Sequence, residues 1–271
     1  MRLIRNMGVG PVCRVLGAAA ALAGGASVAA ELPLRLHYPT RTNDVVLTDV
    51  AEGALEVRPR GRDTGGRAFL AIGDLRRLRA RLNFLLPRAF HDAVEQLEAG
   101  NPEAALPVLE EYASPFLNFT ELAALPGNML PTVLTYLEAL VAAERWERAA
   151  DVATRLPLAS APPRTLRRVG DIAARLAEAG RERELRRVHE HVLDARRLTE
   201  AQLGVLMELA ERWRAAGDYR RAFDLYRKIQ LTEGPHRRRA RLWVAYSSFY
   251  LGHEIVPDVF LDTLPEMAPG A

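Results

Sequence analysis

Cysteine is almost absent from this chain, since Cys13 is the only one among 271 residues. A framework of disulfide bonds, on which many small secreted domains depend, is therefore excluded. The sequence also lacks a glycine-rich phosphate-binding loop, a nucleophile elbow around a serine, and a cysteine–histidine pair. We therefore expect no catalytic residue, no bound metal and no small-molecule cofactor.

Lysine is nearly as scarce, because Lys228 stands beside 36 arginines. The formal net charge is +3, from 37 basic and 34 acidic residues. Arg2, Arg5 and Arg14 lie in the first 30 residues, which contain no acid, and removing these three from 37 leaves 34 basic residues. The remaining chain is therefore neutral. Neutrality does not favour the phosphate backbone of DNA or RNA, so nucleic acid is not an expected partner.

Residues 1–30 have the composition of a secretory signal peptide. Arg2 and Arg5 form a charged start, and a stretch rich in alanine, glycine and leucine follows from Val15 to Ala26. Small residues then suit cleavage near Ala29 or Ala30. The apolar stretch is shorter than the ~20 residues that span a membrane, and a retained membrane anchor is the alternative. We expect an exported bacterial protein that is periplasmic or associated with the outer membrane.

Residues 31–75 alternate between apolar and polar side chains, which is typical of β-strands. The alternation is clearest at Leu34 and Leu36, and turns are indicated by Gly53 and by segments 59–61 and 63–66. We predict three or four short strands that form a small β-sheet or an SH3-like half-barrel. A sheet of this size is marginal alone, so we expect it to pack on the first helices that follow.

From residue 76 onward the apolar side chains follow the period of a helix, most clearly in residues 206–235. The first helix of this segment presents an apolar stripe at Leu206, Leu209, Ala210 and Trp213. Gly217 ends that helix, and Asp218 can cap a second one. The second helix is predicted to bury Tyr219, Ala222, Phe223, Tyr226 and Ile229. Pro235 closes the unit, because the residue before a proline is pushed out of the helical region.

This helical hairpin resembles the tetratricopeptide repeat (TPR). The resemblance is carried by a small residue, an aromatic residue three positions on, Gly-Asp-Tyr at the turn, and a second small residue with its aromatic. Looser copies place turns at Gly100, Glu144, Gly180, Gly217 and Gly252, which are separated by 44, 36, 37 and 35 residues, near the ~34 of this repeat class.

The resemblance implies a mostly α fold, in which residues 76–271 form a TPR-like solenoid, a right-handed α-α superhelix, behind the small β module. About four helical hairpins are expected, followed by a C-terminal capping helix pair. Pro257 makes the second helix of that last pair, residues 258–264, short.

Two helix starts carry recognisable capping signals. Asn101 is predicted to cap a helix whose first position is Pro102, where the missing N–H of proline is tolerated. Thr199 and Gln202 have the spacing of a capping box, in which each side chain bonds the backbone N–H of the other residue.

The widest spacing between turns contains residues 113–131, an insertion that is broken by three prolines and is nevertheless apolar. A free loop would not carry so many apolar side chains. We predict a short helix folded back over the first groove, and a partner-binding loop is the alternative.

Several charged groups have alternative interpretations. His189 and His191 are two positions apart, so on a helix their rings point about 200° apart and cannot share a metal ion, and His189 is expected partly inside its hairpin. The neighbouring carboxylates Glu110–Glu111, and Glu182 with Glu184, are interpreted as solvated. Residues 237–239 with Arg241 form either an anion site or, preferably, a solvated face.

The resemblance further implies a non-catalytic scaffold that binds a protein or peptide partner in its concave groove, and the predicted signal peptide indicates that this scaffold acts in the bacterial cell envelope. Residues on the first helix of each hairpin would line this groove: Arg167, Met207, Glu211, Arg214, Arg239, Tyr246, Phe249 and Tyr250. The alternative is that Tyr246 and Tyr250 pack under the C-terminal cap. Two other functions remain open: an envelope enzyme acting on cell-wall glycan, and a purely structural subunit of an envelope complex with which the chain associates peripherally.

Overall fold

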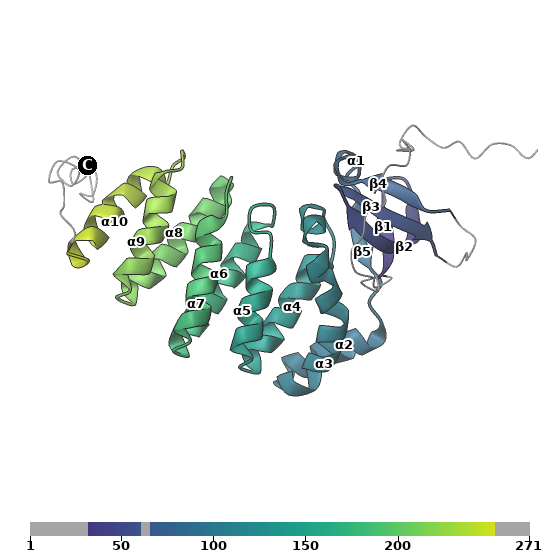
Figure 1. Cartoon of the computed structure of the whole chain (residues 1–271), viewed down its shortest axis with the longest axis horizontal. Helices are drawn as coiled ribbons and strands as arrows, with labels where there is room; N and C mark the ends of the chain where they lie inside the picture. The colour runs from purple at the N-terminus through teal and green to yellow at the C-terminus, as the bar shows by residue number, and fades with distance from the viewer. Residues whose placement is uncertain (1–31, 61–65, 253–271) are drawn as a thin grey trace, which may run out of the picture. The chain divides into compact units, whose positions relative to one another are not determined.

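The computed structural model describes residues 32–60 and 66–252 (Figure 1). These residues form two compact units, divided between Ala139 and Leu140. The predicted leader, Pro257 and the predicted helix at 258–264 lie outside the described residues. None of the helices in the described ranges is both long enough and apolar enough to cross a membrane.

The first unit begins with an antiparallel sheet whose strand order is β4-β3-β2-β1-β5. Its strands are β1 (Leu32–His37), β2 (Thr42–Ala51), β3 (Ala54–Pro59), β4 (Ala68–Ala71) and β5 (Arg81–Phe84). The first four follow one another as a meander, and the short helix α1 (Ile72–Arg77) then brings β5 back beside β1. The small β-sheet expected from the sequence is confirmed, and its strands pair antiparallel.

The sheet buries one side chain in two, as its sequence alternation predicts. Leu34 and Leu36 of β1 and Leu47 of β2 are at most 1% exposed, and their neighbours along each strand are more exposed. The sheet has more than the three or four strands expected, because β5 lies beyond residue 75. Its four residues alternate between polar and apolar, but they follow α1 and lie outside the segment in which strands were predicted.

The helical part of the first unit starts with α2 (Arg88–Glu98) and α3 (Pro102–Ala113) and continues into α4 (Met129–Ala142). Pro102 takes the first position of α3, as predicted. Asn101 stands at the cap position, but its side chain accepts no bond from the helix and instead donates to Gln96 Oε1 at 3.2 Å. The predicted side-chain cap is therefore wrong, and the side chain bridges the two helices at the turn.

The insertion at 113–131 forms two short 3-10 segments, η1 (Ser114–Asn118) and η2 (Thr120–Ala124), instead of the predicted helix. Phe116, Leu117 and Leu122 are at most 4% exposed, so these side chains are not available to a partner. Three prolines prevent a continuous helix, because each lacks the N–H that an interior turn would donate. The insertion is therefore part of the core of the first unit.

After η2 the chain pairs with the edge of β5. Gly127 forms a parallel bridge with Leu82, the Leu82 N–H donates to Pro126 O at 2.8 Å, and the Asn128 N–H donates to Leu82 O at 3.3 Å. The Asn128 side chain completes the contact, since its Oδ1 accepts from the Phe84 N–H at 2.8 Å and its Nδ2 donates to Phe84 O at 2.9 Å. An edge strand that would otherwise expose unpaired backbone groups is thereby covered.

The second unit consists of helices that follow one another as antiparallel neighbours in Figure 1. They are α5 (Trp146–Arg155), α6 (Pro163–Glu178), α7 (Glu182–Asp194), α8 (Glu200–Ala215), α9 (Tyr219–Gln230) and α10 (Arg237–Tyr250). Contacts are extensive between α6 and α7, between α8 and α9, and between α9 and α10. The helical-hairpin repeat expected from the resemblance to the tetratricopeptide repeat is confirmed.

All five predicted turn residues have a positive φ, which confirms the turn positions. The angles are +83° at Gly100, +56° at Glu144, +66° at Gly180, +80° at Gly217 and +69° at Gly252. Glycine adopts this region without a steric penalty, whereas Glu144 must adopt it with a side chain. The turn geometry of the repeat is therefore kept even where its usual residue is missing.

The apolar stripes of the best-matching hairpin meet at small residues. Ala210 and Ala222 are fully buried, Tyr226 is fully buried, and Trp213 is 5% exposed. Tyr219 and Phe223 are only half-buried, contrary to the prediction, because the buried face of α9 runs through Leu225 instead. Because the axes of α8 and α9 approach closely at these alanines, space remains beside them for the large rings of Trp213 and Tyr226.

Polar side chains tie successive hairpins together at helix ends. The capping box is confirmed, because Thr199 Oγ1 accepts from the Gln202 N–H and Gln202 Oε1 accepts from the Thr199 N–H. The buried Gln202 amide also donates to Leu158 O at 2.7 Å and to Ala161 O at 2.9 Å. Lys228 Nζ donates to Leu193 O and Ala195 O at the end of α7, at 2.6 and 2.5 Å.

Candidate partner-binding face

The first helices of successive hairpins, α6, α8 and α10, carry all eight predicted groove residues. We call the side of these helices that holds their mutual ion pairs the first-helix face. Between α6 and α8, Arg167 pairs with Glu208 at 3.0 Å and Arg212 pairs with Asp171 at 2.8 Å. Between α8 and α10, Arg239 pairs with Glu211 at 2.6 Å.

Each ion pair on this face joins one basic and one acidic side chain. Both pairs between α6 and α8 join residues 41 positions apart, so the same displacement between the two helices generates both. Each pair is largely exposed, and exposed ion pairs contribute only about 0–1 kcal/mol. Their effect is to hold long charged side chains in a regular arrangement across successive first helices.

The eight predicted groove residues fall into three groups. Arg167, Glu211 and Arg239 take part in the ion pairs of the first-helix face. Arg214, Tyr246, Phe249 and Tyr250 belong to an aromatic cluster at the α10 end of the face. Met207 is only 4% exposed, so its side chain is part of the core and does not reach the surface.

The aromatic cluster joins α9 to α10. Tyr219 stacks on Tyr250 with ring centroids 4.3 Å apart and an interplanar angle of 10°. Tyr246 lies edge-on to Trp243 at 5.2 Å, and its hydroxyl lies 3.2 Å from that of Tyr250. Hydrogen bonding between these hydroxyls raises the pKa of Tyr250. The rings are held against one another and present a pre-ordered surface.

Arg214 connects this cluster to the core of the preceding hairpin. Its guanidinium lies over the Trp243 ring, 4.2 Å from the centroid, which is a favourable cation–π geometry. Burial raises the pKa of Tyr226 to about 12, and the neighbouring Arg214 opposes that shift. Arg214 therefore packs between α8 and α10, and its substitution would disturb the structure as well as the surface.

Phe249 and Tyr250 are the exposed members of the cluster. Phe249 is 66% exposed and Tyr250 is 50% exposed, at the last positions of α10. Elsewhere in residues 32–60 and 66–252, only Phe69 at 53% and Leu231 at 79% are large apolar side chains of comparable exposure. The pair on α10 differs from these two side chains because it lies beside other aromatic rings.

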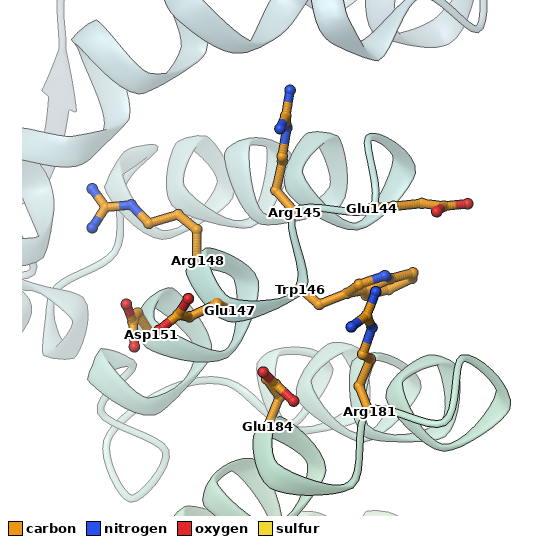
Figure 2. Close-up of a pocket in the computed structure, with 8 residues that line it drawn as sticks. All are labelled: Glu144, Arg145, Trp146, Glu147, Arg148, Asp151, Arg181 and Glu184. Atoms are coloured by element: carbon orange, nitrogen blue, oxygen red, sulfur yellow. The ribbon is translucent and has the colours of Figure 1, made fainter.

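A pocket of about 490 Å³ lies at the turn side of the second unit, where α5 and α7 begin (Figure 2). It is lined by Glu144, Arg145, Trp146, Glu147, Arg148, Asp151, Arg181 and Glu184. Figure 2 shows Trp146 at the start of α5, and Arg181 and Glu184 at the start of α7. The Asp151 carboxylate accepts a bond from Arg187. Acids and arginines alternate here, so the lining specifies neither an anion nor a cation.

The sequence did not single out this pocket or three of the ion-pair residues on the first-helix face. Glu208, Asp171 and Arg212 were absent from the predicted set, because each is an ordinary exposed charge when its helix is considered alone. Comparing positions 41 residues apart would have revealed the complementary charges of Arg167 with Glu208 and of Asp171 with Arg212. The complementary charges therefore become visible only when positions on two successive first helices are compared, and not when one helix is considered alone.

The histidines of α7 point to different parts of the structure. His189 is 6% exposed, as expected, and its Nε2 lies 3.8 Å from Asp224 Oδ2 on α9. His191 Nε2 instead lies 2.9 Å from Leu156 O. In the part of the chain that the structure describes, no group of three or more His, Cys, Asp or Glu side chains could hold a metal ion.

The buried histidine predicts a pH-dependent stability. Burial lowers the pKa of His189, with Asp224 and Asp218 opposing the shift and Arg221 reinforcing it. At pH values below about 6.5, the usual pKa of histidine, the unfolded chain therefore binds a proton at this site more readily than the folded chain does. The free energy of unfolding should be highest above about pH 6.5, should fall as the pH drops from there toward the lowered pKa of the folded state, and should level off below that pKa.

Urea unfolding of wild-type protein and His189→Leu, at about pH 7.5 and about pH 5, measures this dependence. We expect the wild-type protein to lose more stability on acidification than the variant, because the variant has no proton to take up at this site. Equal losses in the two proteins would contradict the assignment to His189.

No protein-family model matches this chain, and no characterised protein sequence matches it. Among solved structures, it is similar to nearly identical TPR-like repeats described as from a kinesin light chain of Podosopora anserina, and to a single-substitution variant of these repeats. The variant is 19% identical, covers 66% of this chain and 91% of its own, and has a TM-score of 0.33. The other is 18% identical, covers 66% and 92%, and has a TM-score of 0.32. The helical repeat described above rests on the chain's own hairpins and their positive-φ turns.

Proposed function

We propose that this chain is a non-catalytic scaffold that holds a partner polypeptide on the first-helix face, at its α10 end. The observation that carries the proposal is the exposure of Phe249 and Tyr250 beside the ordered rings of Tyr219 and Tyr246. Adjacent large apolar side chains at a surface are typical of interaction sites. Rigid aromatic rings offer contact area with little loss of conformational entropy on binding.

The chemistry of the face indicates what the partner presents. An apolar or proline side chain of the partner would contact Phe249 and Tyr250. Polar backbone groups would lie against the ion pairs of α6, α8 and α10, which can exchange hydrogen bonds with them. The proposal includes a right-handed superhelix whose concave groove follows this face, as in the repeat class that the chain resembles.

The proposed location is the bacterial cell envelope. Residues 1–30 have the charged start, apolar stretch and small cleavage-site residues of an exported protein, with cleavage near Ala29 or Ala30. The mature chain would act in the periplasm or at the outer membrane, in peripheral association with an envelope complex. The expected partner is a protein or peptide.

Removing the two exposed rings tests the proposal. We expect Phe249→Ala with Tyr250→Ala to weaken capture of the envelope partner by about 30-fold, since an interface hot spot contributes ~2 kcal/mol or more. The mature chain would be immobilised, and the captured partner would be identified by mass spectrometry and quantified by titration. Circular dichroism would show whether the helices persist in the variant.

The matched control is Phe69→Ala with Leu231→Ala, which removes two large apolar side chains of similar exposure outside the first-helix face. This control should capture the partner as the wild-type chain does. Equal weakening by both double variants, or full capture by the first, would place recognition elsewhere. Release of fragments from isolated cell-wall glycan by the purified chain would support an enzyme instead.

A further inference from the structure

The two edges of the β-sheet differ in what lies beside them. The edge at β5 is covered by the segment that follows η2, through the backbone bonds of Leu82 and the side-chain bonds of Asn128 to Phe84. The strand order ends at β4 on the other side. Among residues 32–60 and 66–252, β3 is the only strand that pairs with β4. We call the outer side of β4 the open edge.

The register of β3 and β4 shows which backbone groups face the open edge. The Ile72 N–H donates to Gly53 O at 2.8 Å, in register with the ladder that joins the two strands. Hydrogen-bonded pairs alternate with non-hydrogen-bonded pairs along an antiparallel ladder. The backbone N–H and C=O of Leu70 therefore face β3, and those of Phe69 face away from it. The N–H of Ala71 points outward like that of Phe69.

The open edge has few of the features that prevent a strand from pairing with another chain. Its four residues, Ala-Phe-Leu-Ala, include no charge and no proline, and their pairing with β3 keeps one register throughout. The Phe69 side chain is 53% exposed. Native sheets usually protect an edge with charges, prolines or bulges. The short length of β4 is the one such feature present here, so we expect any pairing at this edge to be weak.

We propose that the open edge pairs with the same edge of a second copy of this chain. A row of outward-facing N–H and C=O groups on a strand is matched by another extended strand. In a two-fold antiparallel pairing centred on Phe69, this residue lies opposite itself, and each Phe69 N–H donates to the C=O of the other. The Ala71 N–H of each chain then donates to the carbonyl of Arg67 in the other chain.

The side chains of the open edge are complementary to themselves in this register. The two Phe69 rings would lie side by side on one face of the joined sheet, where aromatic cross-strand pairs are favourable. Ala68 would lie opposite the half-buried Leu70 of the second copy on the other face. Arg67 would lie opposite an alanine, so like charges do not meet and its bond to Glu56 at 2.7 Å is kept. This match favours a second copy over an unrelated strand.

Light scattering and sedimentation of the mature chain over a range of concentrations test the proposal. We expect a monomer in dilute solution and a growing proportion of dimer between about 10 and about 100 µM, because so small an interface is weak. Phe69→Pro removes an N–H that faces the open edge and no bond within the sheet, so it should fold and remain a monomer. A wild-type chain that is monomeric at every concentration would overturn the proposal.

Charge substitutions at Phe69 test the two-fold register. Phe69→Lys alone and Phe69→Glu alone each place like charges opposite one another, so each variant should remain monomeric. Mixed in equal amounts, the two variants should form a heterodimer, because opposite charges then face each other. The matched control is Leu231→Lys, which adds a charge at a 79% exposed position in the second unit and should dimerise as the wild-type chain does. Dimers of either single variant, or none in the mixture, would overturn pairing centred on Phe69.

Amide exchange distinguishes a second copy from other occupants of the open edge. In dilute solution the Phe69 N–H should exchange rapidly while the Leu70 N–H, which faces β3, is protected, and protection of Phe69 should appear on dimerisation. Protection of Phe69 in the dilute monomer would show that another segment of this chain covers the edge, and would overturn the proposal. Because Phe69 lies in the first unit, outside the first-helix face, failure here leaves the proposed partner-binding face unaffected.

Discussion

Replacing Trp213 with alanine is expected to lower the free energy of unfolding of the second unit by ~3–5 kcal/mol, the usual range for removing a large core aromatic. The Trp213 side chain is 5% exposed, so its removal would leave a cavity in the core. Its ring also supports Arg221, whose guanidinium lies 5.8 Å from the ring centroid. Urea unfolding followed by circular dichroism measures the loss.

Trp146→Ala provides the comparison, because Trp146 is only half-buried at the mouth of the pocket in Figure 2. We expect its removal to lower stability by less than half as much. In a linear repeat array the damage at Trp213 should extend mainly to neighbouring hairpins, so amide exchange should rise in α8 and α9 before it rises in α5. An unchanged melting transition in Trp213→Ala would show that the apolar stripe of α8 is assigned incorrectly.

Gly127→Ala is expected to destabilise the first unit by ~2–5 kcal/mol. A Cβ at this position would lie 1.9 Å from the carbonyl oxygen of Leu82, and backbone cannot move aside as a flexible side chain can. The segment would have to leave β5, which would break its backbone bonds to Leu82 and the two bonds of the Asn128 side chain to Phe84. Each such bond contributes about 0.5–1.5 kcal/mol.

Gly73→Ala is the matched control, since Gly73 lies in α1 of the same unit and a Cβ added there would meet nothing within 4 Å. Alanine should stabilise α1 by ~0.5–1 kcal/mol, because glycine in a helix loses more conformational entropy on folding. Thermal unfolding of both variants separates the two effects. Similar changes in Gly127→Ala and Gly73→Ala would mean that the contact with β5 is not needed for folding.

The covered edge of β5 also explains why the insertion interrupts the repeat. The predicted alternatives for residues 113–131 were a helix over the groove and a partner-binding loop, and both treated the segment as an addition to the helices. Its apolar side chains are instead buried within the first unit, and its end pairs with β5. The insertion therefore connects the β module to the hairpins, and its buried apolar side chains are not available to a partner.

Local features of the fold could be predicted from the sequence because they depend on neighbouring residues alone. A positive φ at Gly180 or Gly217 follows from the conformational freedom of glycine, and the capping box at Thr199 follows from bonds within one helical turn. The apolar stripe of α8 likewise follows from its periodicity. The candidate face was predictable to the same extent, since first-helix positions such as Phe249 and Tyr250 come from repeat register.

The tertiary structure decided which side chains meet across repeats. The sequence alone does not show that Gln202 also bonds the loop before α6, that Arg167 pairs with Glu208, or that Met207 turns inward. Each depends on how far one helix is rotated and shifted against the next, a quantity set by the packing of many side chains together. Asn128 likewise bonds to the backbone of Phe84, 44 residues earlier. The unpaired backbone groups at a sheet edge can bond to any segment that tertiary packing places beside them, so the sequence does not specify the partner.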